Sequence, residues 1–270
     1  HLSTETVSTI GEQRSANYAL QPMDVEDFVR VVTAGQPSTP SYFGFDAGLN
    51  KADRALMDTD PPRPMSLDEV LAAQADGALV LDTRDPSDFA AGHLAGSINV
   101  GVNGRYAEYV GSVVPPGTTI VLVSDPGTER EAKVRLARIG FDDVLGHLDG
   151  GAARLVERPE VARQASRLQV GTFDEVVGRH DVQVVDVRGP GEHALGSIPG
   201  AVAIPLAELR DAVGSLDLDR PIVAYCAGGY RSSVAASLLR ALGAEDVSDL
   251  LGGYGAWAQA HAATDPAPQG

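Results

Sequence analysis

The chain of 270 residues carries a formal net charge of −16, with 43% apolar and 21% charged residues. This composition predicts a globular protein of about two domains. The acidity argues against nucleic acid or an anionic membrane as a partner, because both require a basic surface, whereas small anions can still bind to a local cradle of backbone N–H groups.

The chain has features of a cytoplasmic protein. No apolar run approaches the roughly 18 residues of a membrane span, and the stretch at the N-terminus lacks the basic and apolar regions of a secretory signal. The only cysteine, Cys226, has no partner for an internal disulfide. Because a free thiol survives best in a reducing compartment, we expect a cytoplasmic location.

Residues 1–64 are expected to form an N-terminal segment and linker. Met23 to Thr33 predicts one amphipathic helix, whereas residues 36–48 are typical of irregular chain. Asp60 to Pro64 predicts a stiff, extended linker, because proline fixes φ. The tail at 264–270 is expected to be disordered.

An internal repeat defines the rest of the architecture. Residues 79–100 align with 184–204, and both stretches carry Asp-x-Arg after an apolar run. Residues 118–151 align with 220–253. We therefore predict two domains of the usual size, at 65–160 and at 166–262.

Each copy predicts alternating strands and helices. In the second copy, Val182 to Val187 and Pro221 to Tyr225 are short apolar runs typical of buried parallel strands. Arg231 to Leu242 has helical periodicity and ends at Gly243, and a third strand ends at Leu250 and Leu251. The expected fold class is α/β, with two tandem domains that each contain a mostly parallel sheet flanked by helices.

Cys226 lies at the junction of a predicted strand and a predicted helix, where open α/β sheets place their ligands. Gly228 and Gly229 allow positive φ and turn backbone N–H groups inward, which gives an anion-binding nest at the start of the helix. Such a field lowers a cysteine pKa from about 8.5. A lone cysteine is also a common inert core residue, but this loop favours a nucleophile.

Two neighbours of Cys226 each fit more than one role. Arg231 fits anion binding better than a solvated position, because cations are disfavoured near a helix N-terminus unless they serve a ligand. Tyr230 fits two roles equally, flanking the mouth of a pocket or packing on the surface.

The motif C-x-x-G-x-R-S at 226–232 resembles the rhodanese family, as do D-V-R…G-S-I-P-G-A before it and L-x-G-G-Y-G-A-W after it. The resemblance implies a tandem rhodanese-type sulfurtransferase: the Cys226 thiolate takes sulfur from thiosulfate or a persulfide and passes it to cyanide or a thiol. It further implies that the amides of six residues hold the persulfide, with no cofactor in this chain. These residues are Ala227, Gly228, Gly229, Tyr230, Arg231, which would also approach the anionic group of the donor, and Ser232.

Two other functions remain as alternatives. One is a non-catalytic persulfide-binding or regulatory module. The other is a cysteine phosphatase, which is less favoured because C-x5-R would place the arginine at 232, where this chain has Ser232. Ser197 occupies a position where the family often has histidine, and His93 and His193 are expected to be packing or surface residues.

The first copy lacks the nucleophile, since Ser124 aligns with Cys226. Asp125 and Glu129 add negative charge where an anion cradle needs the opposite, and Asp125 is expected to act as an N-cap. We predict a non-catalytic copy that packs against, orients or gates its sibling. The Asp-x-Arg pairs recur in both copies, so a structural hydrogen-bonding role is expected for them: Asp82 with Arg84, and Asp186 with Arg188.

Residues 2–20 resemble the last helical stretch of metallo-β-lactamase-fold hydrolases of the glyoxalase II and persulfide dioxygenase type. The order of segments is similar to that of persulfide dioxygenase and rhodanese fusion proteins, in which a non-haem iron domain comes first. We therefore expect the chain to be the C-terminal part of such a protein. This chain has no H-x-H-x-D-H run, so the iron would belong to the upstream domain.

Overall fold

The computed structural model describes residues 7–34, 42–49, 51, 58–179 and 181–262, and the tail expected to be disordered lies outside these ranges. The chain divides into two compact units, residues 1–38 and 39–270. No helix in the described ranges is long and apolar enough to cross a membrane.

The first unit contains short helices: α1 (Ile10–Ala16), the 3₁₀ turn η1 (Tyr18–Leu20) and α2 (Val25–Thr33). Thr9 and Glu12 form a capping box at the start of α1, and the Asp24 side chain caps α2. The predicted helix is confirmed and begins at Val25 rather than Met23. The fusion with an upstream metallo-β-lactamase-fold domain remains a prediction.

The second unit begins with helix α3 (Tyr42–Leu49), so the expectation of irregular chain was wrong for these residues. Tyr42 is buried against helix α6, where Gly111 leaves room for its ring. Tertiary packing of this kind overrides weak local helix propensity. Pro64, the last residue of the expected linker, pairs with His147 of the first sheet.

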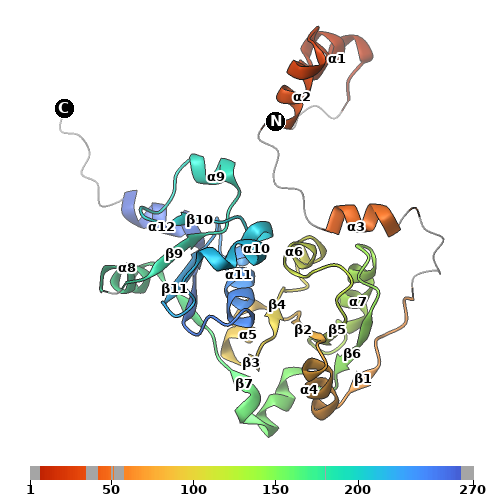
Figure 1. Cartoon of the computed structure of the whole chain (residues 1–270), viewed down its shortest axis with the longest axis vertical. Coiled ribbons are helices and arrows are strands. Elements are labelled where there is room, and N and C mark those ends of the chain that lie inside the picture. The colour runs from red at the N-terminus through yellow and green to blue at the C-terminus, as the bar shows by residue number, and fades with distance from the viewer. Residues whose placement is uncertain (1–6, 35–41, 50, 52–57, 180, 263–270) are drawn as a thin grey trace. The chain divides into compact units, whose positions relative to one another are not determined.

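The two copies of the repeat have the same architecture, a five-stranded parallel sheet flanked by helices (Figure 1). The strand order is β1-β6-β5-β2-β4 in the first copy and β10-β9-β11-β12-β8 in the second. The predicted α/β class with tandem parallel sheets is confirmed. The elements of the first copy are β1 (Pro64–Met65), α4 (Leu67–Ala75), β2 (Leu79–Asp82), α5 (Pro86–Ala91), β3 (His93–Leu94), β4 (Ile98–Asn99), α6 (Tyr106–Val113), β5 (Ile120–Val123), α7 (Glu129–Ala137), β6 (Val144–Leu148) and η2 (Gly151–Glu157).

A short connection leads into the second copy. It consists of η3 (Pro159–Val161) and β7 (Ala162–Arg163), and β7 pairs antiparallel with β3. The elements of the second copy are β8 (Ser166–Leu168), α8 (Val170–Arg179), β9 (Gln183–Asp186), α9 (Pro190–Ala194), β10 (Val202–Ala203), η4 (Leu206–Glu208), α10 (Leu209–Ala212), η5 (Val213–Ser215), β11 (Ile222–Tyr225), α11 (Tyr230–Ala241), β12 (Val247–Leu250) and α12 (Gly253–Ala262).

The two copies share one hydrophobic core. Side chains alternate along a strand, so each sheet has an inner and an outer face. Val185 and Ala224 of the second sheet lie in the same buried cluster as Leu81 and Leu122 of the first. Their neighbours Val184 and Val80 lie instead in separate outer clusters. The inner faces are therefore joined across the helices between them, which include α6 and α11 (Figure 1).

Helix α11 is also hydrogen-bonded to the edge of the first sheet. The backbone N–H of Asn99, at the end of β4, donates to Ser237 Oγ at 2.9 Å, and both groups are buried. Arg210 adds a second connection by donating to the carbonyl oxygen of Val113 at 2.8 and 3.0 Å. These bonds hold the first copy in register with the helix that follows the Cys226 loop.

We predict that Ser237→Ala lowers the free energy of unfolding by about 1–3 kcal/mol, because the buried N–H of Asn99 loses its acceptor. Urea denaturation measures this change. Ser215→Ala is the matched control: Ser215 also donates to a backbone carbonyl, but it is exposed, so about 0.5 kcal/mol or less is expected. Equal losses in the two variants would contradict the interpretation.

Candidate active site

Cys226 directly follows β11, the central strand of the second sheet, and precedes helix α11. Its side chain is 2% exposed. The N–H of Gly229 donates to Sγ at 3.1 Å, and the thiol lies 3.6 Å from Ser232 Oγ. The sulfur therefore sits at the start of a helix with a backbone donor directed at it, which is the environment that stabilises a sulfur anion.

The two glycines of the loop have different roles. Gly229 has φ +102° and forms the N-cap of α11, and a Cβ there would lie 3.3 Å from the backbone nitrogen of Gly252. Gly228 is not in the positive-φ region and would have open space around a Cβ. The expectation of two left-handed glycines was therefore right for Gly229 and wrong for Gly228, since a single left-handed residue is enough to start the helix.

Helix α12 supports the loop from behind. The N–H of Tyr254 donates to the carbonyl of Cys226 at 2.7 Å, and the N–H of Gly255 donates to that of Ala227 at 3.1 Å. Gly253 has φ +57°, and a Cβ on it would collide with the Cys226 carbonyl oxygen. The L-x-G-G-Y-G-A-W motif thus holds two loop carbonyls on one side, which leaves the loop amides free to face the other side.

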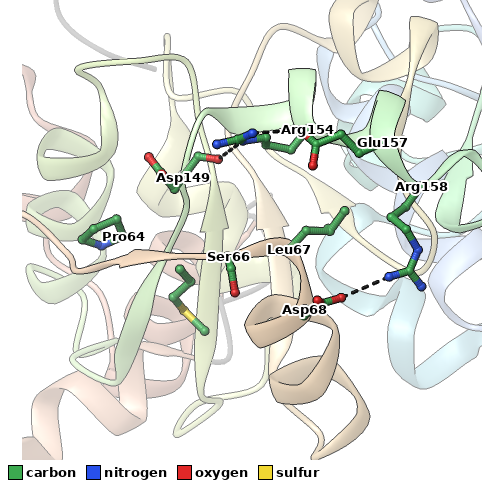
Figure 2. A pocket seen from close by; sticks show the side chains of 9 residues that line it. Pro64, Ser66, Leu67, Asp68, Asp149, Arg154, Glu157 and Arg158 are labelled. Atoms are coloured by element: carbon green, nitrogen blue, oxygen red, sulfur yellow. Dashed lines mark hydrogen bonds and ion pairs between the residues drawn. The ribbon is translucent and has the colours of Figure 1, made fainter.

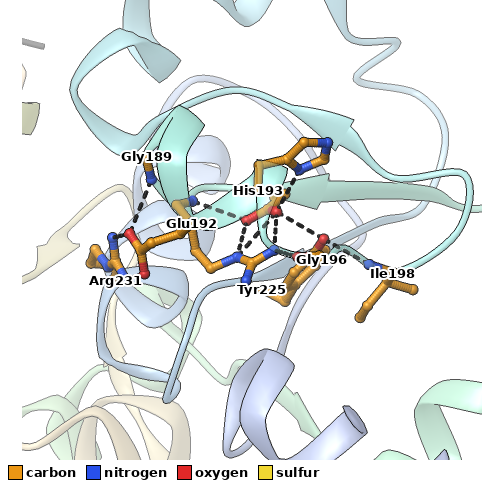
Figure 3. Close-up of polar contacts among 9 residues, drawn as sticks. Gly189, Glu192, His193, Gly196, Ile198, Tyr225 and Arg231 are labelled. Atoms are coloured by element: carbon orange, nitrogen blue, oxygen red, sulfur yellow. Dashed lines mark hydrogen bonds and ion pairs between the residues drawn. The ribbon is translucent and has the colours of Figure 1, made fainter. Parts of the chain in front are cut away.

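Arg231 makes a two-pronged ion pair with Glu192 of α9, with both N···O distances 2.7 Å (Figure 3). Glu192 also accepts from the N–H of Gly189 at 3.2 Å. The hydrogen bond with Arg231 lowers the pKa of Glu192 and raises that of Arg231. The cation expected to attract an anionic donor is therefore already balanced by a carboxylate, and its role toward the donor remains a prediction.

Asp186, at the end of β9, is the centre of a network of hydrogen bonds beside β11; its partners Tyr225 and His193 are labelled in Figure 3. Arg188 binds both of its carboxylate oxygens, the Tyr225 hydroxyl donates at 2.9 Å, and His193 Nδ1 lies 2.8 Å away. Burial would raise the pKa of Asp186, but bonds from Arg188, His193 and Tyr225 keep it below its ordinary value. The expected structural role of Asp186 and Arg188 agrees with this geometry.

The first copy has the same Asp-x-Arg pair with fewer partners. Arg84 binds both oxygens of Asp82, but Val123 and Phe89 occupy the positions that align with Tyr225 and His193. Burial consequently dominates and raises the pKa of Asp82. His93, expected to be a packing residue, is buried and stacked on Phe89.

In the first copy, side chains of the protein already bind the groups of the equivalent loop. Glu129 accepts from the N–H of Gly127 at 2.8 Å, and Gly127 aligns with the glycine that donates to the cysteine sulfur in the second copy. Ser124 accepts from Thr83 Oγ1 at 2.7 Å. The expectation that Asp125 caps α7 was wrong: Thr128 is the N-cap residue, and it bonds the backbone carbonyl of Asp125.

Tyr230, which fitted two roles in the sequence, is half-buried against the first copy. Its hydroxyl donates to the carbonyl of Gly101 at 2.6 Å, and its ring centroid lies 5.2 Å from that of Tyr109. Burial raises the pKa of Tyr230 to about 12. Sequence reasoning missed Glu192, Tyr225 and Tyr109. A position-by-position comparison of the two copies would have drawn attention to Tyr225, where the first copy has valine.

A cavity of about 590 Å³ lies elsewhere, at the carboxyl ends of β1 and β6 in the first copy (Figure 2). Two ion pairs lie among the five charged residues that line it: Arg154 with Glu157 at 2.7 Å, and Arg158 with Asp68 at 3.0 Å. None of the residues predicted as functional lines it, and we assign it no chemistry.

A family model described as a rhodanese-like domain matches residues 66–157 and 170–260. The chain belongs to the rhodanese-like family. The resemblance found in the motifs around Cys226 is thereby confirmed, and both matched ranges lie within the copies of the repeat.

Several proteins are similar to this rhodanese-like chain. Thiosulfate sulfurtransferase GlpE of Pseudoalteromonas translucida is 36% identical over 87 residues, which cover 32% of this chain and 83% of that protein. An HTH-type transcriptional regulator of Mycobacterium tuberculosis is 43% identical over 98 residues, which cover 35% of this chain and 40% of the regulator. A solved rhodanese-like domain protein of Staphylococcus aureus is 32% identical, with 34% of this chain and 90% of that chain covered and a TM-score of 0.33. The named sulfurtransferase relatives support sulfurtransferase activity.

We predict that Gly253→Ala lowers kcat/KM for sulfur transfer by about tenfold to a hundredfold, because a small displacement of a reacting group has this effect. Gly151→Ala is the matched control: Gly151 has φ +59°, and its Cβ would lie 2.9 Å from the carbonyl oxygen of Ser124. Each variant also loses about 1–2 kcal/mol of stability from left-handed strain. Equal activity losses in both would show that strain, and not placement of Cys226, is responsible.

Proposed function

We propose that this protein is a sulfurtransferase in which Cys226 carries sulfur as a persulfide. The observation that supports the proposal is the Cys226 sulfur at the start of α11 with the Gly229 N–H directed at it. The sulfurtransferase relatives point to the same chemistry. We further propose thiosulfate and persulfides as donors, thiols and cyanide as acceptors, and a role in sulfide or persulfide metabolism in the cytoplasm.

The proposed reaction has two displacements at sulfur. The Cys226 thiolate attacks the outer sulfur of thiosulfate, the S–S bond of the donor breaks, and sulfite leaves with the electron pair. The acceptor then attacks the outer sulfur of the Cys226 persulfide. That second S–S bond breaks, its electron pair returns to Sγ, and thiocyanate or a new persulfide leaves. The two steps balance without an external oxidant or reductant, so the proposal requires no cofactor.

The loop residues supply the stabilisation that both steps need. Negative charge rests on sulfur before, between and after the displacements, and the Gly229 N–H lies 3.1 Å from it. The Ser232 hydroxyl lies 3.6 Å from the same sulfur and itself donates to the Gly229 carbonyl. We propose that the amides from Ala227 to Ser232 surround the outer sulfur of the persulfide, since the carbonyls of Cys226 and Ala227 are held by α12 on the opposite side.

A regulatory persulfide-binding module is the second candidate. Two observations favour it: Cys226 is 2% exposed, and one similar protein is named a transcriptional regulator. Mass spectrometry separates the two functions. A gain of one sulfur atom after thiosulfate treatment that a thiol then removes over many cycles indicates an enzyme, whereas a gain that persists indicates a carrier or sensor.

A cysteine phosphatase is the third candidate and the least supported. Its loop would place an arginine at the position of Ser232, whereas the arginine of this chain comes one residue earlier and is paired with Glu192. Hydrolysis of an aryl phosphate by the wild-type protein, lost in Cys226→Ser, would favour this function over sulfur transfer.

We predict that Cys226→Ser reduces thiosulfate-dependent formation of thiocyanate to background, because a serine hydroxyl is not ionised at neutral pH. Ser124→Ala changes the aligned residue of the first copy and is expected to leave the rate unchanged. Colorimetric assay of thiocyanate measures both variants. Sulfur transfer that continues in Cys226→Ser would exclude the mechanism.

We predict opposite effects at the two ends of the Arg231 ion pair. Arg231→Ala should raise the KM for thiosulfate by about tenfold to a hundredfold, since hydrogen bonds to charged groups are worth about 1.5–3 kcal/mol. Glu192→Gln should lower this KM severalfold, because the guanidinium is freed for the donor. Steady-state kinetics with varied thiosulfate tests both. If both substitutions raise KM, Arg231 acts only by holding α9.

A further inference from the structure

A tyrosine of the first copy contacts the tyrosine that follows the Cys226 loop in the second copy. Tyr230 is the first residue of α11, immediately after the Cys226 loop, and Tyr109 lies on α6 of the first copy. Their ring centroids are 5.2 Å apart with an angle of 38° between the planes. One aromatic ring from each copy therefore forms a continuous surface next to the loop.

Tyr109 interacts electrostatically with two residues of the loop, Arg231 and Cys226. Burial raises the pKa of Tyr109, the charge of Arg231 lowers it, and the charge of Cys226 raises it. The residue is half-buried. Its ring contact with Tyr230, the residue that directly follows the loop, agrees with a position of Tyr109 near the loop.

This aromatic surface is held in place by several contacts. The Tyr230 hydroxyl is fixed by the carbonyl of Gly101, and a Cβ on Gly101 would lie 3.7 Å from the Tyr230 ring. A few residues further along α11, Ser237 is bonded to the end of β4. The two rings are thus part of an ordered interface between the copies.

The surface is aromatic rather than charged. The guanidinium of Arg105 lies 5.8 Å from the centre of the Tyr109 ring, but it also pairs with Glu108 at 2.5 Å. Arg231 is likewise paired with Glu192. Aromatic faces gain energy from contact with carbon-bearing groups, and thiosulfate and cyanide offer few such groups. An organic thiol or organic persulfide does offer them.

We infer that Tyr109, contributed by the copy without a nucleophile, determines specificity for organic thiols and organic persulfides at Cys226, with Tyr230 completing the binding surface. The inference rests on the proposed sulfur-transfer function and names the class of substrate for that site. It gives the first copy a direct part in recognition, beyond packing against its sibling.

The test compares acceptors in full-length protein, with thiosulfate as the donor in every assay. Tyr109→Ala is expected to raise the KM for dithiothreitol or glutathione by about twofold to tenfold, since an aromatic contact is worth about 0.5–1.5 kcal/mol beyond burial. The KM for cyanide and kcat with cyanide should change by less than about twofold. Tyr109→Phe keeps the ring and should retain the KM of wild type for the organic thiols. Tyr18→Ala, at an exposed tyrosine of the first unit, is the matched control.

Two results would overturn the inference: an equal change of KM for cyanide and for the organic thiols, or a Tyr109→Phe variant that loses organic-thiol binding as Tyr109→Ala does. Thermal unfolding checks that each variant is folded. If Tyr109→Ala is not, Tyr109→Leu keeps the bulk without the aromatic face and is expected to show the same split between acceptors. The thiosulfate and cyanide reaction of wild type tests the proposed function separately, because it does not involve the organic acceptor.

Discussion

The two hydrogen bonds from the first turn of α12 to the carbonyls of Cys226 and Ala227 are the constraint on which the site depends. The peptide groups of a loop after a strand can point in many directions. Because α12 binds the carbonyls of Cys226 and Ala227, the N–H groups of the loop point away from α12. The contact requires very close approach of two backbones, and only glycine at 253 permits it. The downstream glycine motif therefore helps to shape the Cys226 loop, although it lies more than 20 residues further along the chain.

The close approach of a glycine to the loop carbonyl recurs in the first copy, so this approach does not distinguish the two loops. Gly151 approaches the carbonyl of Ser124 as Gly253 approaches that of Cys226. The difference lies in what the loop amide faces: a sulfur at Gly229 in the second copy, and the Glu129 carboxylate at Gly127 in the first. An amide that already donates to a carboxylate cannot also donate to a substrate anion. The loop of the first copy therefore lacks both the thiol and a free N–H at Gly127.

Features set by local pattern could be predicted from the sequence. The strand before Cys226 and the helix after it were each placed to within one residue at either end, because apolar runs and periodicity act over short distances. Features that depend on distant partners could not. Helix α3 requires the packing of Tyr42 on α6, the Arg231–Glu192 pair joins residues 39 positions apart, and Tyr109 contacts Tyr230 from the other copy. Periodicity contains no information about such contacts.

Strand alternation explains why the copy without a nucleophile lies beside the active loop. Tyr225 faces the outer cluster and Ala224 the inner one, so the side chain of Cys226 continues on the inner side, in the core shared with the first copy. Helix α11 covers the same side, and its buried residues Val234 and Leu238 belong to the same cluster as Leu81 and Leu122 of the first copy. Loss of the nucleophile from the first copy removes none of these contacts. The first copy can therefore still be required for folding of the second even without a nucleophile, because it covers the inner face that carries Cys226.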